Sequence, residues 1–117
     1  MKRITEQVDL SFVIPAYNEE DAIDISLDTL NGVVKDKKLR YEIVVVDDGS
    51  LDRTLSRARK YASGDRHVTV VSCDKNKGKG YAVQAGFMQT NGDVVVLAFS
   101  SMDNEYFAAD SACYLGA

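Results

Sequence analysis

A chain of 117 residues can bury the core of one domain but not of two, so we expect residues 1–117 to form a single domain. The composition, 45% hydrophobic and 27% charged, is typical of a folded globular protein and excludes disorder as the main state. The net charge of −4 excludes nonspecific attraction to nucleic acid or to an anionic membrane.

The chain begins with a predicted strand, helix and strand. Leu10–Ile14 is an apolar run, which predicts a buried strand. From Glu19 to about Lys37 an amphipathic helix is predicted, because apolar residues recur there at helical spacing. These residues are Ile23, Leu27, Leu30 and Val34. A second apolar run, Tyr41–Val46, predicts the next strand.

The same alternation continues through the rest of the chain. Ser50 is a suitable N-cap for a second helix, which Gly64 ends. The remaining segments predict a strand, a helix and a strand, at Val68–Ser72, Gly80–Gln89 and Val94–Phe99. Only residues 103–117 are hard to place, although Tyr106–Leu115 has the residues of a final helix. Strands and helices that alternate in this way predict an α/β fold with a doubly wound parallel sheet and right-handed crossovers.

The cysteines, the histidine and the apolar segments point to a cytoplasmic protein without a metal centre built on Cys or His. Residues 1–7 lack the apolar core of a signal peptide, and the longest apolar run, Val94–Phe99, is too short to span a bilayer. Cys73 and Cys113 do not have metal-ligand spacing, and we expect free thiols. The single histidine, His67, is expected in the loop before a strand.

Polar residues follow the first two predicted strands, at the edge where open α/β proteins bind ligands. After the first strand comes P-A-Y-N-E-E, in which the Tyr17 ring offers a stacking surface for a base. Glu19 or Glu20 offers an acceptor for ribose hydroxyls or base N–H groups. Alternatively, Asn18 and the glutamates only cap the helix and complement its dipole, and this interpretation is favoured when the cluster is taken alone.

Asp47-Asp48-Gly49-Ser50 follows the second strand. Two adjacent carboxylates are costly there unless a positive or hydrogen-bond-donating partner meets them, and a base N–H group or a metal would serve. Alternatively, the segment Asp47-Asp48-Gly49-Ser50 only forms a tight turn and caps the next helix. A receiver-type phosphoacceptor site is excluded, because its paired aspartates follow the first strand and it needs a further Asp and a Lys after later strands.

Asn76-Lys77-Gly78-Lys79-Gly80 leads into the third predicted helix. The glycines let backbone N–H groups approach an anion, the helix N-terminus adds partial positive charge, and Lys77 or Lys79 would neutralise a diphosphate. The spacing, and the lack of Ser or Thr after the lysine, exclude a Walker loop. A solvated turn explains this segment equally well.

Taken in order, four segments resemble the nucleotide-binding half of the family 2 glycosyltransferases, which have the GT-A fold. They read P-A-Y-N-E-E, V-V-V-D-D-G-S-L-D-R-T, N-K-G-K-G-Y-A-V-Q-A-G-F and N-G-D-V-V-V-L. The resemblance spans about Leu10 to Leu97 and is nearest to the dolichol-phosphate and polyprenyl-phosphate sugar transferases. It implies a three-layer, Rossmann-like sheet of four strands in the order 3-2-1-4. It also implies, for the complete domain, inverting transfer of a sugar from a UDP- or GDP-linked donor to a lipid-phosphate or saccharide acceptor.

The resemblance further implies a set of nucleotide-binding residues. They are Pro15, Ala16, Tyr17 and Glu19 around the nucleoside, Asp47 and Asp48 at the base or ribose, and Gly78 and Lys79 beside the phosphates.

The chain departs from the family at the expected Mg²⁺ or Mn²⁺ site. Relatives carry Asp-x-Asp shortly after G-D-V-V-V-L, where Phe99 and Ser101 stand here. Loss of both carboxylates removes charge that would offset the leaving diphosphate. Asp103 falls where some relatives carry a third ligand, although one carboxylate with a Ser hydroxyl makes a poor site. The resembled domain continues beyond the length of this chain, and no catalytic base is identified.

Two functions therefore remain. One is a glycosyltransferase domain, peripheral at the membrane in a full-length form. The other is a non-catalytic nucleotide-binding or assembly module, which Phe99 and Ser101 favour. In either case Val94–Phe99 is an apolar strand at a sheet edge, so we expect self-association through it or through exchange of Tyr106–Leu115.

Overall fold

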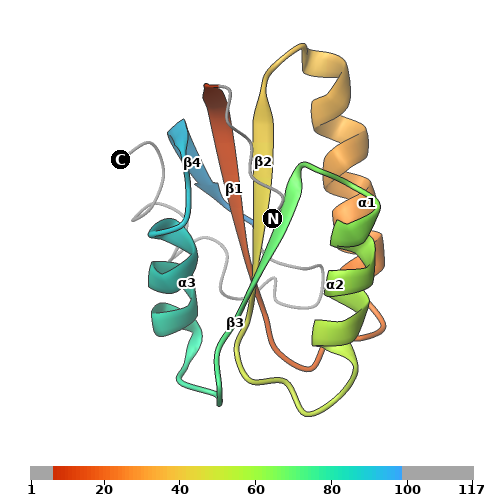
Figure 1. Ribbon diagram of the computed structural model, residues 1–117, viewed down its shortest axis with the longest axis vertical. Coiled ribbons are helices and arrows are strands. Elements are labelled where there is room, and N and C mark those ends of the chain that lie inside the picture. The colour runs from red at the N-terminus through yellow and green to blue at the C-terminus, as the bar shows by residue number, and fades with distance from the viewer. Residues whose placement is uncertain (1–6, 99–117) are drawn as a thin grey trace.

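Four parallel strands form one sheet in the order β3-β2-β1-β4 (Figure 1). The strands are β1 (Val8–Ala16), β2 (Tyr41–Asp47), β3 (Val68–Ser72) and β4 (Gly92–Leu97). The helices are α1 (Ile23–Val34), α2 (Thr54–Ser63) and α3 (Lys79–Phe87), with a short 3-10 turn, η1 (Lys35–Lys37), after α1. The expected α/β class and strand order are confirmed.

The structure, a computed structural model, describes residues 7–98. Several expectations lie outside this range: the departures at Phe99 and Ser101, the candidate ligand Asp103, the free thiol of Cys113, and the final helix at Tyr106–Leu115. Within residues 7–98, none of the helices has both the length and the apolar character needed to cross a bilayer. Cys73 is a free cysteine, and His67 lies directly before β3, as expected.

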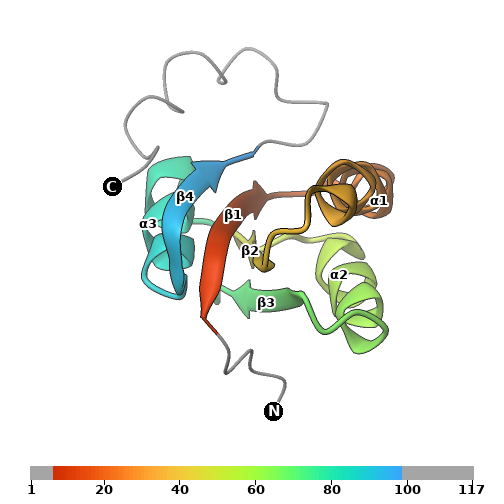
Figure 2. The same ribbon diagram turned by 90° about the horizontal axis from the view of Figure 1, so that it is seen from above.

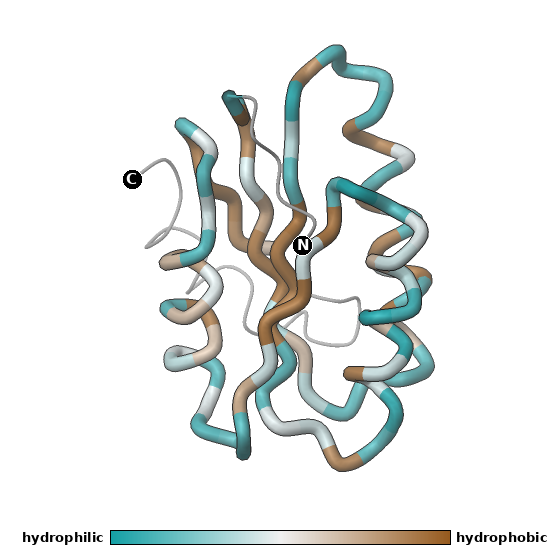
Figure 3. Tube along the Cα trace, viewed as in Figure 1, coloured by the Kyte–Doolittle hydropathy of each residue, from teal (hydrophilic) through white to brown (hydrophobic). Residues whose placement is uncertain are grey.

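Both faces of the sheet are covered, which explains why its strands are continuous apolar runs and not alternating ones. Helices α1 and α2 lie on one face and α3 on the other (Figure 2). Alternate residues of β2 serve the two layers: Ile43 packs toward α1 and α2, and Val44 packs toward α3. The centre of the sheet is accordingly the most hydrophobic part of the molecule (Figure 3).

The start of each of the first two helices differs from the prediction. Helix α1 begins at Ile23, four residues after Glu19. Helix α2 begins at Thr54, so the predicted Ser50 N-cap is wrong. Arg53 stands at the N-cap and makes no capping bond with its side chain; Asp52, just before it, accepts hydrogen bonds through Oδ1 from the Thr54 backbone N–H at 2.9 Å and from the Thr54 hydroxyl at 2.5 Å.

The strand register brings the carboxyl ends of three strands to one level. Ala16 pairs with Asp47, and Asp47 pairs with Ser72. Strand β4 pairs with β1 only up to Val13, so Pro15, which has no N–H to donate, lies beyond that ladder. The loops that follow β1, β2 and β3 therefore leave the sheet side by side.

Candidate functional site at the carboxyl edge of the sheet

The loops after β1 and β2 are joined by backbone hydrogen bonds to side chains. Asn18 N–H donates to Ser50 Oγ at 2.8 Å, and Asn18 Oδ1 accepts from the Leu51 N–H at 2.8 Å. Glu19 N–H donates to Thr54 Oγ1 at 2.7 Å. Ser50, expected as a helix cap, is thus used to hold the neighbouring loop.

The loop after β3 is held by Asp48. Its Oδ1 accepts from the Lys77 N–H at 2.9 Å, and its Oδ2 accepts from the Gly78 N–H at 3.1 Å. The Asn76 amide donates to the same Oδ2 at 3.0 Å and to the Asp48 carbonyl oxygen at 3.2 Å. The partners that satisfy this carboxylate are therefore groups of the protein itself.

Gly49 allows the loops after β2 and β3 to touch. Its φ is 73°, and a Cβ at this position would lie 2.3 Å from the Lys75 carbonyl carbon and 2.4 Å from the Asn76 nitrogen. Both neighbours are backbone atoms, so any larger residue would force the loops apart. The three loops consequently form one packed unit.

A cavity of about 320 Å³ opens between these loops. Seven of the eight predicted nucleotide-binding residues line it: Pro15, Ala16, Tyr17, Glu19, Asp48, Gly78 and Lys79. Asn76 also lines it; the residue belongs to the N-K-G-K-G segment but had been given no role. The sequence feature that could have identified Asn76 is its position directly before Lys77-Gly78, in the loop that contacts the Asp48 carboxylate.

Asp47 is not among the lining residues. Successive residues of a strand point to opposite faces of the sheet. Asp48 contacts the loop before α3, whereas Asp47 Oδ2 accepts a hydrogen bond at 3.3 Å from the Ser50 N–H, in the loop before α2. Asp47 is only 2% exposed, and its Oδ1 has no hydrogen-bond partner within residues 7–98. Its contact with a nucleotide remains a prediction.

The part of the cavity lined by Gly78 and Lys79 lies at the start of a helix. Helix α3 starts directly after Gly78, whose φ is 99°, and no side chain caps its first turn. That turn contains no acidic residue, although the Asp48 carboxylate accepts a hydrogen bond from the Gly78 N–H directly before it. Lys79 lines the cavity there, and the Lys77 ammonium lies 4.8 Å from the centre of the Tyr81 ring.

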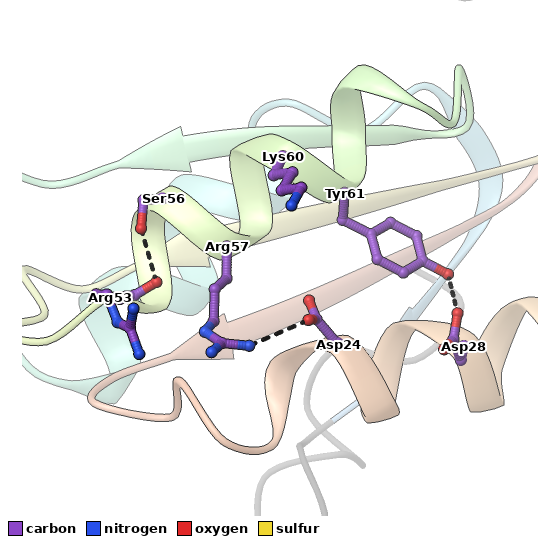
Figure 4. A pocket seen from close by; sticks show the side chains of 7 residues that line it. All are labelled: Asp24, Asp28, Arg53, Ser56, Arg57, Lys60 and Tyr61. Atoms are coloured by element: carbon purple, nitrogen blue, oxygen red, sulfur yellow. Dashed lines mark hydrogen bonds and ion pairs between the residues drawn. The ribbon is translucent and has the colours of Figure 1, made fainter.

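A larger hollow of about 590 Å³ lies between α1 and α2, away from the sheet edge (Figure 4). Its side chains pair with one another: Arg57 lies 3.4 Å from an Asp24 carboxylate oxygen, and the Tyr61 hydroxyl donates to Asp28 at 2.7 Å. Burial and this contact with Asp28 raise the pKa of Tyr61 to about 12. These contacts hold the two helices together, and the hollow offers no set of groups arranged for chemistry.

Within residues 7–98, no group of three or more His, Cys, Asp and Glu side chains could hold a metal ion. The expectation for Asp103 lies outside that range.

Comparisons with known proteins agree with the fold. A family model described as Glycosyl transferase family 2 matches residues 11–108. The human dolichyl-phosphate beta-glucosyltransferase is 36% identical over 96 residues, which cover 76% of this chain and 30% of that protein. The undecaprenyl-phosphate 4-deoxy-4-formamido-L-arabinose transferase of Pectobacterium carotovorum is 34% identical over 96 residues, which cover 81% of this chain and 29% of that protein.

Two solved structures are similar as well. The mannosyltransferase PcManGT from Pyrobaculum calidifontis, in complex with GDP-Man and Mn²⁺, superposes with a TM-score of 0.69 at 28% identity. The alignment covers 81% of this chain and 28% of that one. S. aureus TarS 1-349 in complex with UDP superposes with a TM-score of 0.66 at 29% identity, covering 79% of this chain and 27% of that one. The chain thus spans less than a third of the length of these relatives.

Proposed function

Since the chain belongs to glycosyltransferase family 2, we propose that the cavity at the carboxyl edge of its sheet binds the nucleoside diphosphate part of a sugar donor. The observation that carries this proposal is the meeting of three loops around one cavity. The cavity is lined both by the aromatic ring of Tyr17 and by Gly78 and Lys79 at the N-terminus of a helix.

The nucleoside and phosphates would occupy different walls. The base would stack on the Tyr17 ring, which is 40% exposed, while Pro15, Ala16 and Glu19 line the same cavity. The phosphates would lie at Gly78 and Lys79, where the N-terminus of α3 and the Lys79 ammonium group favour negative charge. Asp48 lines the same cavity, whereas Asp47, the remaining candidate for contact with the nucleotide, does not.

The donor and acceptor classes follow from the relatives. Solved relatives hold UDP, UDP-GlcNAc or GDP-Man, so a UDP- or GDP-linked sugar is the proposed donor. Two relatives are named for dolichyl phosphate and undecaprenyl phosphate, and we extend a lipid-phosphate acceptor to this chain, which would then work peripherally at a membrane. No catalytic base is assigned within residues 7–98.

A divalent cation remains part of the proposal only by analogy. One solved relative contains Mn²⁺ with its sugar nucleotide. When bound, such an ion would offset the charge of the leaving diphosphate. Asp103 is the candidate ligand.

The second candidate function is a non-catalytic nucleotide-binding or assembly module. The sequence observation that favours it is Phe99 and Ser101 at the two Asp-x-Asp positions. Such a module would bind UDP or GDP but leave the sugar–phosphate bond intact.

Calorimetry tests the binding proposal. The chain should give weak but measurable heats with UDP or GDP, with and without Mn²⁺. A Lys60→Ala variant, altered in the separate hollow between α1 and α2, should bind equally well. Absence of heat with both nucleotides, in a chain shown to be folded by circular dichroism, would remove the proposal. Turnover of a nucleotide sugar then separates the enzyme from the module.

A further inference from the structure

We infer that Thr54 is a positioning residue for the nucleoside, because its buried hydroxyl fixes the loop after β1, and this loop carries Tyr17 and Glu19 to the cavity. The inference rests on the proposed function, since it names what orders part of the lining of that cavity. Thr54 and its partner Asp52 are not among the lining residues. They stand in the segment V-V-V-D-D-G-S-L-D-R-T, in which only the two adjacent aspartates were expected to bind the nucleotide.

The hydroxyl of Thr54 is held in one orientation. Thr54 is 0% exposed, and its hydroxyl donates to Asp52 Oδ1 at 2.5 Å. An ionised carboxylate can only accept hydrogen bonds, so the hydroxyl hydrogen points toward Asp52. The lone pairs of the Thr54 oxygen are therefore left to accept, and the Glu19 N–H donates to this oxygen at 2.7 Å.

The Asp52 carboxylate supports the same loop in two ways. Burial raises the pKa of its carboxyl, but hydrogen bonds from the Thr54 hydroxyl, the Thr54 N–H and the Glu20 N–H outweigh burial and lower the pKa below its usual value. Asp52 therefore stays an acceptor at neutral pH. Its Oδ2 also accepts directly from the Glu20 N–H at 3.3 Å. The pair thus receives two successive N–H groups of the loop after β1, those of Glu19 and Glu20.

The backbone of Glu19 is fixed on both sides. Its N–H is held by Thr54, and its carbonyl oxygen accepts from the N–H of Ile23, the first residue of α1, at 2.9 Å. Tyr17 lies two residues before this fixed point and is 40% exposed, so few contacts of its own restrain the ring. The placement of the Tyr17 ring beside the cavity therefore depends on the anchor at the Glu19 N–H.

Removal of the hydroxyl tests this role. Thr54→Val keeps nearly the same side-chain shape and leaves the Glu19 N–H without its acceptor. UDP affinity should fall by roughly three- to thirtyfold, which is part of the factor for an unsatisfied buried N–H group, because the bond from Asn18 to Ser50 still holds the loop. Inorganic pyrophosphate should bind the variant as well as the parent chain, because its proposed place is at the start of α3. Thr54→Ser keeps the hydroxyl and should restore UDP affinity.

Hydrogen exchange of the ligand-free chain supplies a readout that does not depend on nucleotide binding. In Thr54→Val the Glu19 amide should exchange roughly ten- to a hundredfold faster, because it has lost its acceptor. Asp52→Ala, at a half-buried position, removes the support of the hydroxyl and should give a smaller effect in the same direction, also where Thr54→Val does not fold. Ser11→Ala is the matched control: it removes an equally buried hydroxyl, bonded to Glu42 within the sheet, and should leave UDP affinity unchanged.

The outcomes separate the two proposals. Unchanged exchange at Glu19 in both Thr54→Val and Asp52→Ala would overturn the positioning role, and so would an equal loss of UDP and pyrophosphate affinity. If the parent chain binds neither UDP nor GDP while exchange at Glu19 still rises, the proposed function fails and the anchoring of the loop by Thr54 stands. Faster exchange, with a loss of affinity confined to UDP and recovered in Thr54→Ser, supports both.

Discussion

Asn18 and Ser50, on different loops, are joined by a hydrogen bond of 2.8 Å from the Asn18 N–H to Ser50 Oγ. Asn18 also accepts from the Leu51 N–H through its side chain. It makes both contacts with a φ of 53°, in the left-handed region that Asn tolerates better than most residues. One residue therefore links the loop carrying Tyr17 to the loop after β2.

Replacing Asn18 should lower the stability of the chain. Asn18→Ala loses the hydrogen bond to the Leu51 N–H. It also leaves at positive φ a residue that cannot form the local side-chain hydrogen bonds by which Asn tolerates this conformation. The free energy of unfolding should therefore fall by about 1–3 kcal/mol. Asn18→Gly also loses the bond but relieves the backbone, and should recover part of that loss. Urea unfolding of both variants measures the difference. A glycine variant less stable than the alanine variant would contradict this account.

Gly86 sets how closely α3 approaches the sheet. A Cβ there would lie 2.6 Å from Val13 Cγ1 and 2.7 Å from Val46 Cγ2, so Gly86→Ala must push α3 outward. We expect a loss of about 1–3 kcal/mol, which outweighs the gain in helix propensity. Gly32→Ala in α1 is the matched control: nothing lies within 4 Å of its Cβ, and it should stabilise by about 0.5–1 kcal/mol. Thermal unfolding that ranks the two variants the other way would contradict the packing argument.

The architecture could be predicted from the sequence, because it depends on patterns local to each segment. The run Val44-Val45-Val46 marks a strand buried on both faces, and the structure confirms it. Contacts between distant segments could not be predicted in this way. Glu42 is buried in β2, 4% exposed, because the Ser11 hydroxyl donates to it at 2.6 Å from β1.

The candidate site shows the same division. Residues that follow strands were expected to meet, and seven of the eight line one cavity. The hydrogen-bond partner of each polar group was harder to predict from the sequence. Ser50 was expected to cap its own helix but bonds to Asn18, and Asp48 bonds to a loop about thirty residues further along the chain. Local propensity does not distinguish these choices, because Ser and Asp form either kind of hydrogen bond.

If the base stacks on Tyr17, its ring should matter for nucleosides and not for phosphates. Tyr17→Ala should weaken UDP binding by roughly five- to a hundredfold, corresponding to about 1–3 kcal/mol for a base stacked on an aromatic ring. Tyr17→Phe keeps the ring and should bind UDP nearly as well as the parent chain. Calorimetry with UDP and with pyrophosphate provides the comparison. An equal loss for both ligands in Tyr17→Ala would show that the ring acts on the loops and not on the base.

Tyr61 should titrate well above ordinary tyrosines. Its pKa is raised to about 12 by burial and then by the hydrogen bond to Asp28, against a usual value of 10.0. Because the folded-state pKa is the higher one, its contribution to stability is complete below pH 10 and is lost as the pH rises toward 12. Alkaline titration of phenolate absorbance should show this late transition, and Tyr61→Phe should remove it. A transition that persists in the variant would assign it to another tyrosine; the pKa of Tyr41 is also raised, first by burial.

Self-association through β4 remains a prediction, and it can be tested at both edges of the sheet. In the part of the chain that the structure describes, β4 pairs only with β1, and Val94 is 39% exposed on it. A strand edge with exposed apolar side chains favours pairing with another copy, so light scattering should report a mass above that of the monomer at high concentration. Val94→Lys should lower that mass, because charged side chains oppose pairing at an edge. Thr69→Lys on β3, the opposite edge, is the matched control and should leave it unchanged. A monomer in the parent chain, or an equal effect of both variants, would exclude β4 as the interface.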